Sequence, residues 1–124
     1  MAVTRVLLVD DESLVRRTLK QILSAYQDLE LVGEAANGEE AISAMERLQP
    51  DVVVMDIRMP AFDGIAAVRA IREKYPRAKI IGLSEYAQSY NIDAMERAGA
   101  LGVYLKSMAL EELYPAIKAA HPAI

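Results

Sequence analysis

The chain has 124 residues, of which 53% are hydrophobic, so it is long enough for one domain with a buried core and too short for two. It contains no cysteine, which excludes disulfides, thiolate metal sites and cysteine nucleophiles. Its net charge is −4 and its basic residues are scattered, so no stripe of positive charge predicts direct binding to nucleic acid or to an anionic membrane. We therefore expect a single domain over residues 1–124.

Strand and helix patterns alternate along the first half of the chain. Residues 5–9 (RVLLV) predict a buried strand, and residues 13–26 carry apolar side chains at near-helical spacing. Residues 29–36 predict a second strand. Residues 37–48 predict a helix with Asn37 as its N-cap, because a glutamate three residues later completes the capping-box pattern.

The same alternation continues in the second half. Residues 51–56 (DVVVMD) predict a third strand, whose continuous apolar run is expected to be covered on both faces, and Pro60 and Gly64 mark the loop after it. The remaining elements are expected at residues 65–75 (helix), 79–84 (strand), 89–99 (helix), 102–106 (strand) and 109–120 (helix). This alternation predicts an α/β fold with helices on both faces of a doubly wound parallel sheet. No apolar run approaches a membrane-spanning length, and a cytoplasmic protein is the simplest interpretation.

Polar side chains stand where the apolar runs end. Asp10 and Asp11 follow the first run, and Asp56, Ser84 and Lys106 end the third, fourth and fifth. Ligands of open parallel sheets bind at the carboxyl ends of the strands, so these side chains are expected to form a site. Clustered carboxylates repel one another, and an oxygen-only donor set favours Mg²⁺ as the cation that holds them together.

The same residues suggest chemistry on phosphate. With Mg²⁺ present, one carboxylate can act as a nucleophile toward phosphorus, while Lys106 and Ser84 neutralise or hydrogen-bond the oxygens of the transferring group. The product would be an acyl phosphate.

Four motifs resemble one family in order and spacing. The stretches "VDDE", "DIRMPAFDG", "LSE" and "AGALGVYLK" resemble the receiver domain of bacterial two-component response regulators, and the resemblance covers nearly the whole chain. The stretches "LVGEAANGEEAI" and "LQPDVVVMDIRMP" are similar to receivers of LuxR/NarL-type regulators, which carry a helix-turn-helix output domain. The resemblance implies a flavodoxin-like fold with five helices and a five-stranded sheet in the order 2-1-3-4-5.

The resemblance also implies a role for each site residue. Asp56 would be the phosphoacceptor, and Ser84 and Lys106 would contact the phosphoryl group. The Mg²⁺ ligands would be Asp11 and Asp56 through carboxylates, Arg58 through its carbonyl, and Asp10 largely through water.

The resemblance implies partners as well. The phosphate would come from a sensor histidine kinase or a phosphotransfer protein, and the chain's own chemistry would be limited to self-phosphorylation and self-dephosphorylation. A DNA-binding output domain would be absent or removed from this segment, and phosphorylation would promote a homodimer.

Two alternatives of other classes remain open. One is a Mg²⁺-dependent phosphohydrolase with an aspartyl nucleophile, but such enzymes resemble a DxDxT motif and Asp56 is followed by "IRMP". The other is a receiver-like interaction module that does not use phosphate, which the presence of all five site residues disfavours.

Three further expectations concern single positions. Many receivers carry an aromatic residue three positions before the site lysine, but here that position is Val103, and Tyr104 is expected on the opposite face of the sheet. Pro115 is expected to kink the last helix or delay its start. Arg16 and Arg17 are expected to be solvated.

Overall fold

The sheet is parallel and contains the five predicted strands. The computed structural model describes residues 3–57, 64–85 and 89–122, without the side chains of residues 89–91. Its strands run in the order β2-β1-β3-β4-β5, as the family resemblance implied. Their bounds are β1 (Thr4–Val9), β2 (Leu29–Ala35), β3 (Val52–Asp56), β4 (Lys79–Ser84) and β5 (Gly102–Leu105).

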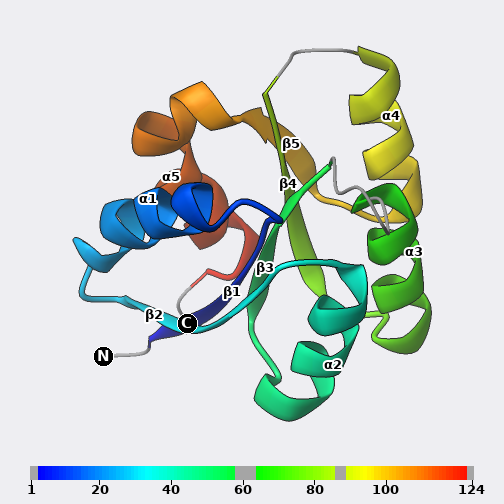
Figure 1. Cartoon of the computed structure of the whole chain (residues 1–124), viewed down its shortest axis with the longest axis horizontal. Helices are drawn as coiled ribbons and strands as arrows, with labels where there is room; N and C mark the ends of the chain where they lie inside the picture. Colours follow the sequence, from blue (N-terminus) through cyan, green and yellow to red (C-terminus); the bar gives the residue numbers. More distant parts are fainter. Residues whose placement is uncertain (1–2, 58–63, 86–88, 123–124) are drawn as a thin grey trace.

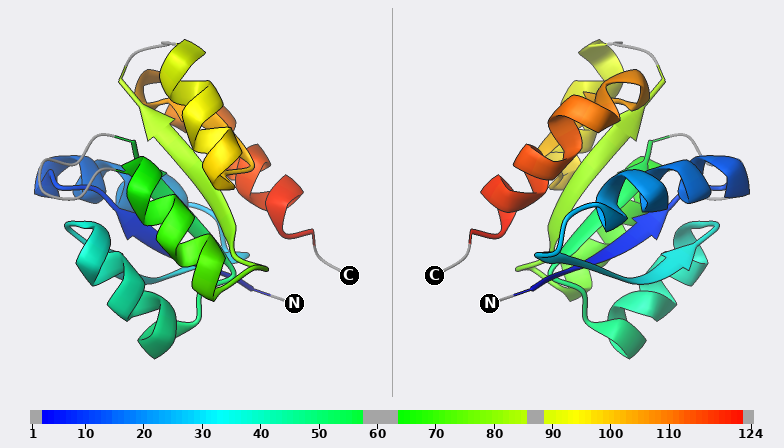
Figure 2. Two further views of the ribbon diagram at one scale, coloured as in Figure 1. Left: turned by 90° about the vertical axis from the view of Figure 1, so that its right-hand side faces the viewer. Right: turned by 90° about the vertical axis from the view of Figure 1, so that its left-hand side faces the viewer.

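Helices cover both faces of this sheet. In the described part of the chain they are α1 (Ser13–Ser24), α2 (Gly38–Leu48), α3 (Gly64–Lys74), α4 (Ser89–Ala98) and α5 (Ala109–Ala120), with a 3-10 turn, η1 (Lys106–Met108), before the last. Helices α1 and α5 lie on one face, and α2, α3 and α4 on the other (Figures 1 and 2). The predicted doubly wound α/β architecture is confirmed.

The core has one apolar cluster on each side of the sheet. Met55, Ile71 and Met95 belong to the cluster under α2, α3 and α4, while Leu23 and Leu113 belong to the cluster under α1 and α5. Every residue of β3 is buried, as its continuous apolar run predicted. The central strands are thereby fixed from both sides.

Local sequence signals account for several element ends. The Glu40 N–H donates to Asn37 Oδ1 at 2.8 Å, and the Glu40 side chain accepts from the Ala36 N–H at 2.9 Å, so the predicted capping pattern at α2 is confirmed. Helix α4 ends before Gly99, whose φ of 123° lies in the region that favours glycine. Helix α1 ends at Ser24, before the predicted end at residue 26.

The last strand and helix test two of the positional predictions. Val103 packs against the α2–α4 cluster and Tyr104 against the α1–α5 cluster, so the two side chains lie on opposite faces of the sheet, as predicted. Helix α5 begins at Ala109 and continues through Pro115 to Ala120. The predicted late start is therefore wrong: Pro115 is exposed, where water can satisfy the carbonyl that lacks a helical donor. The kink stays a prediction.

Candidate functional site

Four strands deliver polar side chains to one edge of the sheet. Asp10 follows β1, Asp56 ends β3, Ser84 ends β4 and Lys106 follows β5. The register pairs Asp56 with Leu83 and Ser84 with the last residue of β5, so the strand ends stand level with one another. These ends can be followed at the upper edge of the sheet in Figure 1. The predicted convergence of strand ends is therefore present in the fold.

Three carboxylates lie close together at this edge. Asp10, Asp11 and Asp56 each offer an oxygen, and these oxygens all lie within 4.8 Å of one another. Asp10 and Asp56 are buried, with 1% and 4% of their surface exposed, whereas Asp11 is exposed. Two acids thus form the floor of the site and one lies at its rim. Such a cluster is unfavourable unless cations offset its charge.

Lys106 provides one of these cations. Its Nζ lies 3.0 Å from Asp10 Oδ2, 3.4 Å from Asp56 Oδ2 and 3.9 Å from Glu85 Oε1. Burial of the ammonium works to lower the pKa of Lys106, but contact with Asp10 and the charges of Asp56 and Asp10 outweigh it and raise that pKa. Lys106 is therefore cationic at neutral pH. One ammonium against three clustered carboxylates leaves the site with excess negative charge.

One buried oxygen retains capacity for a further ligand. Asp10 Oδ1 accepts the Glu12 N–H at 2.9 Å, but no well-aligned hydrogen bond reaches Asp10 Oδ2 from any residue that the structure describes. Lys106 Nζ lies close to this oxygen and supplies positive charge, but it is not aligned to donate a hydrogen bond to it. A buried carboxylate oxygen with free lone pairs, beside two further carboxylates, suits a hard divalent cation such as Mg²⁺. The described residues therefore fit the metal; Arg58, the fourth predicted ligand, lies outside them.

Arg16 supports the acidic loop, a role that the sequence did not reveal. Its Nη1 donates to the Asp10 carbonyl oxygen at 2.5 Å and its Nε to Glu34 Oε1 at 3.0 Å. The Arg16 side chain is only 17% exposed, so its predicted solvation is wrong, whereas Arg17 is exposed as predicted. No local pattern signals this contact, because it depends on the sheet register: Leu8 pairs with Glu34, which places that acid beside the end of β1.

Gly64 fixes the end of β3 from the other side. Its N–H donates to the Ile57 carbonyl at 2.8 Å. A Cβ at this position would lie 2.3 Å from the Asp56 carbonyl oxygen and 2.7 Å from Ile57 Cα. Only glycine allows α3 to start this close to the strand end, so Gly64 helps to position Asp56. The sequence pattern indicated only that Gly64 belongs to a loop.

The helices of this fold are short. Within the residues that the structure describes, none combines the length and the apolar character needed to cross a bilayer.

Comparisons with known proteins agree on one family. The family model of the response regulator receiver domain matches residues 6–118. The chain is 40% identical over 111 residues to the protein-glutamate methylesterase/protein-glutamine glutaminase of Methanococcoides burtonii, covering 88% of this chain and 31% of that protein. It is 36% identical over 118 residues to the nitrate/nitrite response regulator protein NarL of Escherichia coli, covering 95% and 53%.

A solved structure gives the same result. A LuxR-family two-component response regulator from Aurantimonas has a TM-score of 0.91 and 34% identity, and the match covers 95% of this chain and 84% of that one. The chain spans about half or less of the length of the curated relatives named above. It belongs to the family of response regulator receiver domains, the phosphorylation-controlled signalling modules of two-component systems.

Proposed function

We propose that this chain is a switch that accepts one phosphoryl group on Asp56, with Mg²⁺ bound beside it. The observation that carries the proposal is the grouping of a buried Asp56 with two further acids and the Lys106 ammonium at the carboxyl edge of the sheet. A sensor histidine kinase or a phosphotransfer protein would supply the phosphoryl group from a phosphohistidine.

The transfer is a substitution at phosphorus. A carboxylate oxygen of Asp56 attacks the phosphorus, the bond from phosphorus to the donor nitrogen breaks, and the electron pair of that bond stays on the donor imidazole. The product is an aspartyl phosphate. Hydrolysis reverses the state of the switch, because water attacks phosphorus and releases inorganic phosphate and the Asp56 carboxylate. Both steps need positive charge near the phosphoryl oxygens.

Residues of the chain supply part of that charge. Lys106 Nζ lies 3.4 Å from Asp56 Oδ2, which places it to pair with an oxygen of the transferred group. Ser84 is 8% exposed at the end of the neighbouring strand and would donate its hydroxyl to another oxygen. Carboxylates of Asp10, Asp11 and Asp56, with the Arg58 carbonyl, would hold Mg²⁺. The metal, when bound, polarises the phosphoryl group as a Lewis acid.

The proposal extends to the protein that contains this receiver. Curated relatives include transcriptional regulators about twice the length of this chain, among them YxjL of Bacillus subtilis, of which the match covers 53%. We infer that the receiver controls a DNA-binding output domain, and that phosphorylation promotes a homodimer.

Intact-mass measurement after treatment with acetyl phosphate and Mg²⁺ tests the proposal. We expect the parent chain to gain the mass of one phosphoryl group and Asp56→Asn to gain none. Asp51→Asn is the matched control: Asp51 directly precedes β3, at the end of that strand opposite to Asp56, so this variant should be labelled like the parent.

Two results would contradict the switch. Labelling that persists in Asp56→Asn would move the phosphoacceptor elsewhere. Turnover of many equivalents of a phosphomonoester would instead identify a phosphohydrolase.

A further inference from the structure

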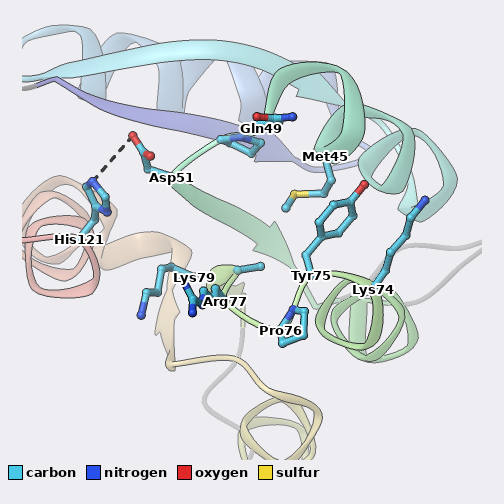
Figure 3. Close-up of a pocket in the computed structure, with 11 residues that line it drawn as sticks. Met45, Gln49, Asp51, Lys74, Tyr75, Pro76, Arg77, Lys79 and His121 are labelled. Atoms are coloured by element: carbon cyan, nitrogen blue, oxygen red, sulfur yellow. Dashed lines mark ion pairs between the residues drawn. The ribbon is translucent and has the colours of Figure 1, made fainter.

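A hollow lies at the end of the sheet opposite to the acidic site. It has a volume of about 640 Å³ and is lined by the end of α2, the connections before β3 and β4, and the residue after α5 (Figure 3). Its volume is within the range of about 300–1,000 Å³ that is common for ligand sites. We call this hollow the basal groove; it is lined by Met45, Gln49, Pro50, Asp51, Lys74, Tyr75, Pro76, Arg77, Ala78, Lys79 and His121. None of these residues belongs to the acidic site.

The basal groove combines apolar side chains with a basic rim. Half-buried Tyr75 and exposed Pro76 provide apolar surface above the buried Met45, while Lys74, Arg77 and Lys79 are exposed. None of these three cations forms an ion pair with a carboxylate in the described part of the chain. In a chain of net charge −4, three unpaired cations around one hollow are a local excess of positive charge.

The one acid that lines the groove is already engaged. Asp51 Oδ2 accepts the Arg5 N–H at 2.8 Å and lies 3.9 Å from His121 Nε2. Arg5 Nη1 also donates to the Gln49 carbonyl at 2.9 Å, which brings a further cation to this end of the molecule. Asp51 therefore holds the wall of the groove together and does not neutralise its rim.

The arrangement of the cations selects the ligand. Lys74 lies beside Tyr75 at one end of the groove, with its Nζ 5.6 Å from the centre of the Tyr75 ring, whereas Lys79 and Arg77 lie toward Asp51 and His121 (Figure 3). Cations that do not converge on one point cannot enclose a compact anion such as phosphate. They can pair one by one with carboxylates spaced along an extended chain.

We propose that the basal groove docks an acidic peptide segment of a partner protein. Carboxylates of the segment pair with Lys74, Arg77 and Lys79, and an apolar side chain between them rests against Tyr75 and Pro76. The partner approaches the amino ends of the strands, so it leaves the carboxyl edge with Asp56 open for phosphorylation. This docking does not depend on the proposed function.

Fluorescence anisotropy with labelled synthetic heptapeptides tests the proposal. The probe alternates glutamate with leucine, and matched probes alternate lysine with leucine or glutamate with serine. We expect only the glutamate-leucine probe to bind at micromolar to millimolar concentration, with affinity that falls as salt rises. The triple variant Lys74→Ala, Arg77→Ala, Lys79→Ala should weaken binding at least about tenfold.

A variant that loses cations away from the groove controls for non-specific attraction. Arg17→Ala with Lys20→Ala removes two exposed cations of α1, away from the groove, and should leave the affinity unchanged. Amide chemical shifts report the location directly: the probe should move the signals of residues 74–79 and leave those around Lys106 in place.

Each other outcome overturns the proposal. These outcomes are absence of binding by the glutamate-leucine probe, equal binding by the triple variant, equal binding by the glutamate-serine probe, shifts centred on another face, or displacement of the probe by inorganic phosphate at equal concentration. The last result would identify a compact anion site instead.

Discussion

Asp11 is the residue through which a metal should act on stability. It is the exposed member of the three-acid cluster, whose oxygens lie within 4.8 Å of one another. Mg²⁺ at about ten times its Kd should stabilise the folded chain by about 1.4 kcal/mol and raise the melting temperature. Asp11→Asn removes a ligand and a repulsive charge, so we expect a higher melting temperature without metal and no rise with it.

Thermal unfolding with and without Mg²⁺ measures both effects. Asp93→Asn on α4 is the control, because it removes an exposed acid outside the cluster and should retain the metal response. A full Mg²⁺ response in Asp11→Asn would mean that this carboxylate is not a ligand.

Arg16 should matter for both stability and phosphorylation. Its side chain bridges the Asp10 carbonyl and Glu34, so Arg16→Ala frees the acidic loop and leaves the Asp10 carbonyl without this donor. We expect a loss of about 1–3 kcal/mol in the free energy of unfolding and slower phosphorylation by acetyl phosphate. Urea denaturation and the time course of intact mass are the measurements. Arg17→Ala changes an exposed neighbour and should match the parent; equal behaviour of the two variants would refute the role.

The residues of the site differ in how far sequence could identify them. Asp10, Asp56, Ser84 and Lys106 were predicted to meet, because strand ends of a parallel sheet must share one edge. The contact of Arg16 could not be predicted, because it depends on the register between β1 and β2, and that register shifts between Val6 and Leu7.

At the scale of elements, a polar contact joins α5 to the connection before β2. The Tyr114 hydroxyl donates to Asp28 Oδ2 at 2.6 Å, Lys118 Nζ lies 3.0 Å from the same oxygen, and the Tyr114 ring stacks on Tyr26 at 3.8 Å. The hydrogen bond from Tyr114, with that from Lys118, lowers the pKa of Asp28 below its ordinary 3.8. The same bond, with burial, raises the pKa of Tyr114 above its ordinary 10.0.

These shifts predict a pH window for stability. A lowered Asp28 pKa gives stabilisation that is present above pH 3.8 and is lost as pH falls through the folded-state value. A raised Tyr114 pKa gives stabilisation that is present below pH 10.0 and is lost as pH rises through the folded-state value. Tyr114→Phe keeps the ring and removes the hydroxyl, so its stability deficit should be largest between these limits.

Urea denaturation of the parent and Tyr114→Phe across this pH range is the measurement. Lys20→Met, on an exposed face of α1, should show no such window. A deficit that does not change with pH would contradict the ionic role of the contact.

The side chains of β5 predict that Tyr104 does not report activation of the switch. Tyr104 packs on the α1–α5 side, while Val103 lies on the α2–α4 side, where a Cβ on Gly82 would lie 3.1 Å from it. An aromatic ring cannot cross the sheet, so we expect Tyr104 to keep its rotamer when the switch is activated. Structures with and without beryllofluoride and Mg²⁺ are the test, and rotation of Tyr104 into space beside Ser84 would contradict it.

The sequence predicted the type and order of the helices and strands more accurately than the residues at which they begin and end. The apolar run between polar residues predicted β4 at residues 79–84, which are its bounds in the structure. This strand is easy to recognise because β3 and β5 flank it and helices cover both of its faces. Two details of the helices depend instead on tertiary surroundings that no local pattern reveals. Helix α1 ends before Tyr26, whose ring stacks on Tyr114. Pro115 lies within α5 and is tolerated there because it faces solvent.

At the scale of the whole molecule, charge is divided between the two ends of the sheet. The carboxyl edge carries the acids grouped around Asp56, and the amino edge carries the unpaired cations of the basal groove. The strands β3 and β4 connect these ends through a core that is buried on both faces. The two proposed sites are therefore separate surfaces of one sheet, so the proposed phosphorylation and docking would not compete for the same surface.

Localisation of the phosphoryl group tests the central claim most directly. Borohydride reduces an aspartyl phosphate to homoserine, which marks the modified position in a peptide map. After treatment with acetyl phosphate and Mg²⁺, we predict homoserine at position 56 and at no other acid. Homoserine at Asp10 or Asp11, or phosphate on His121, would contradict the assignment of Asp56 as the phosphoacceptor.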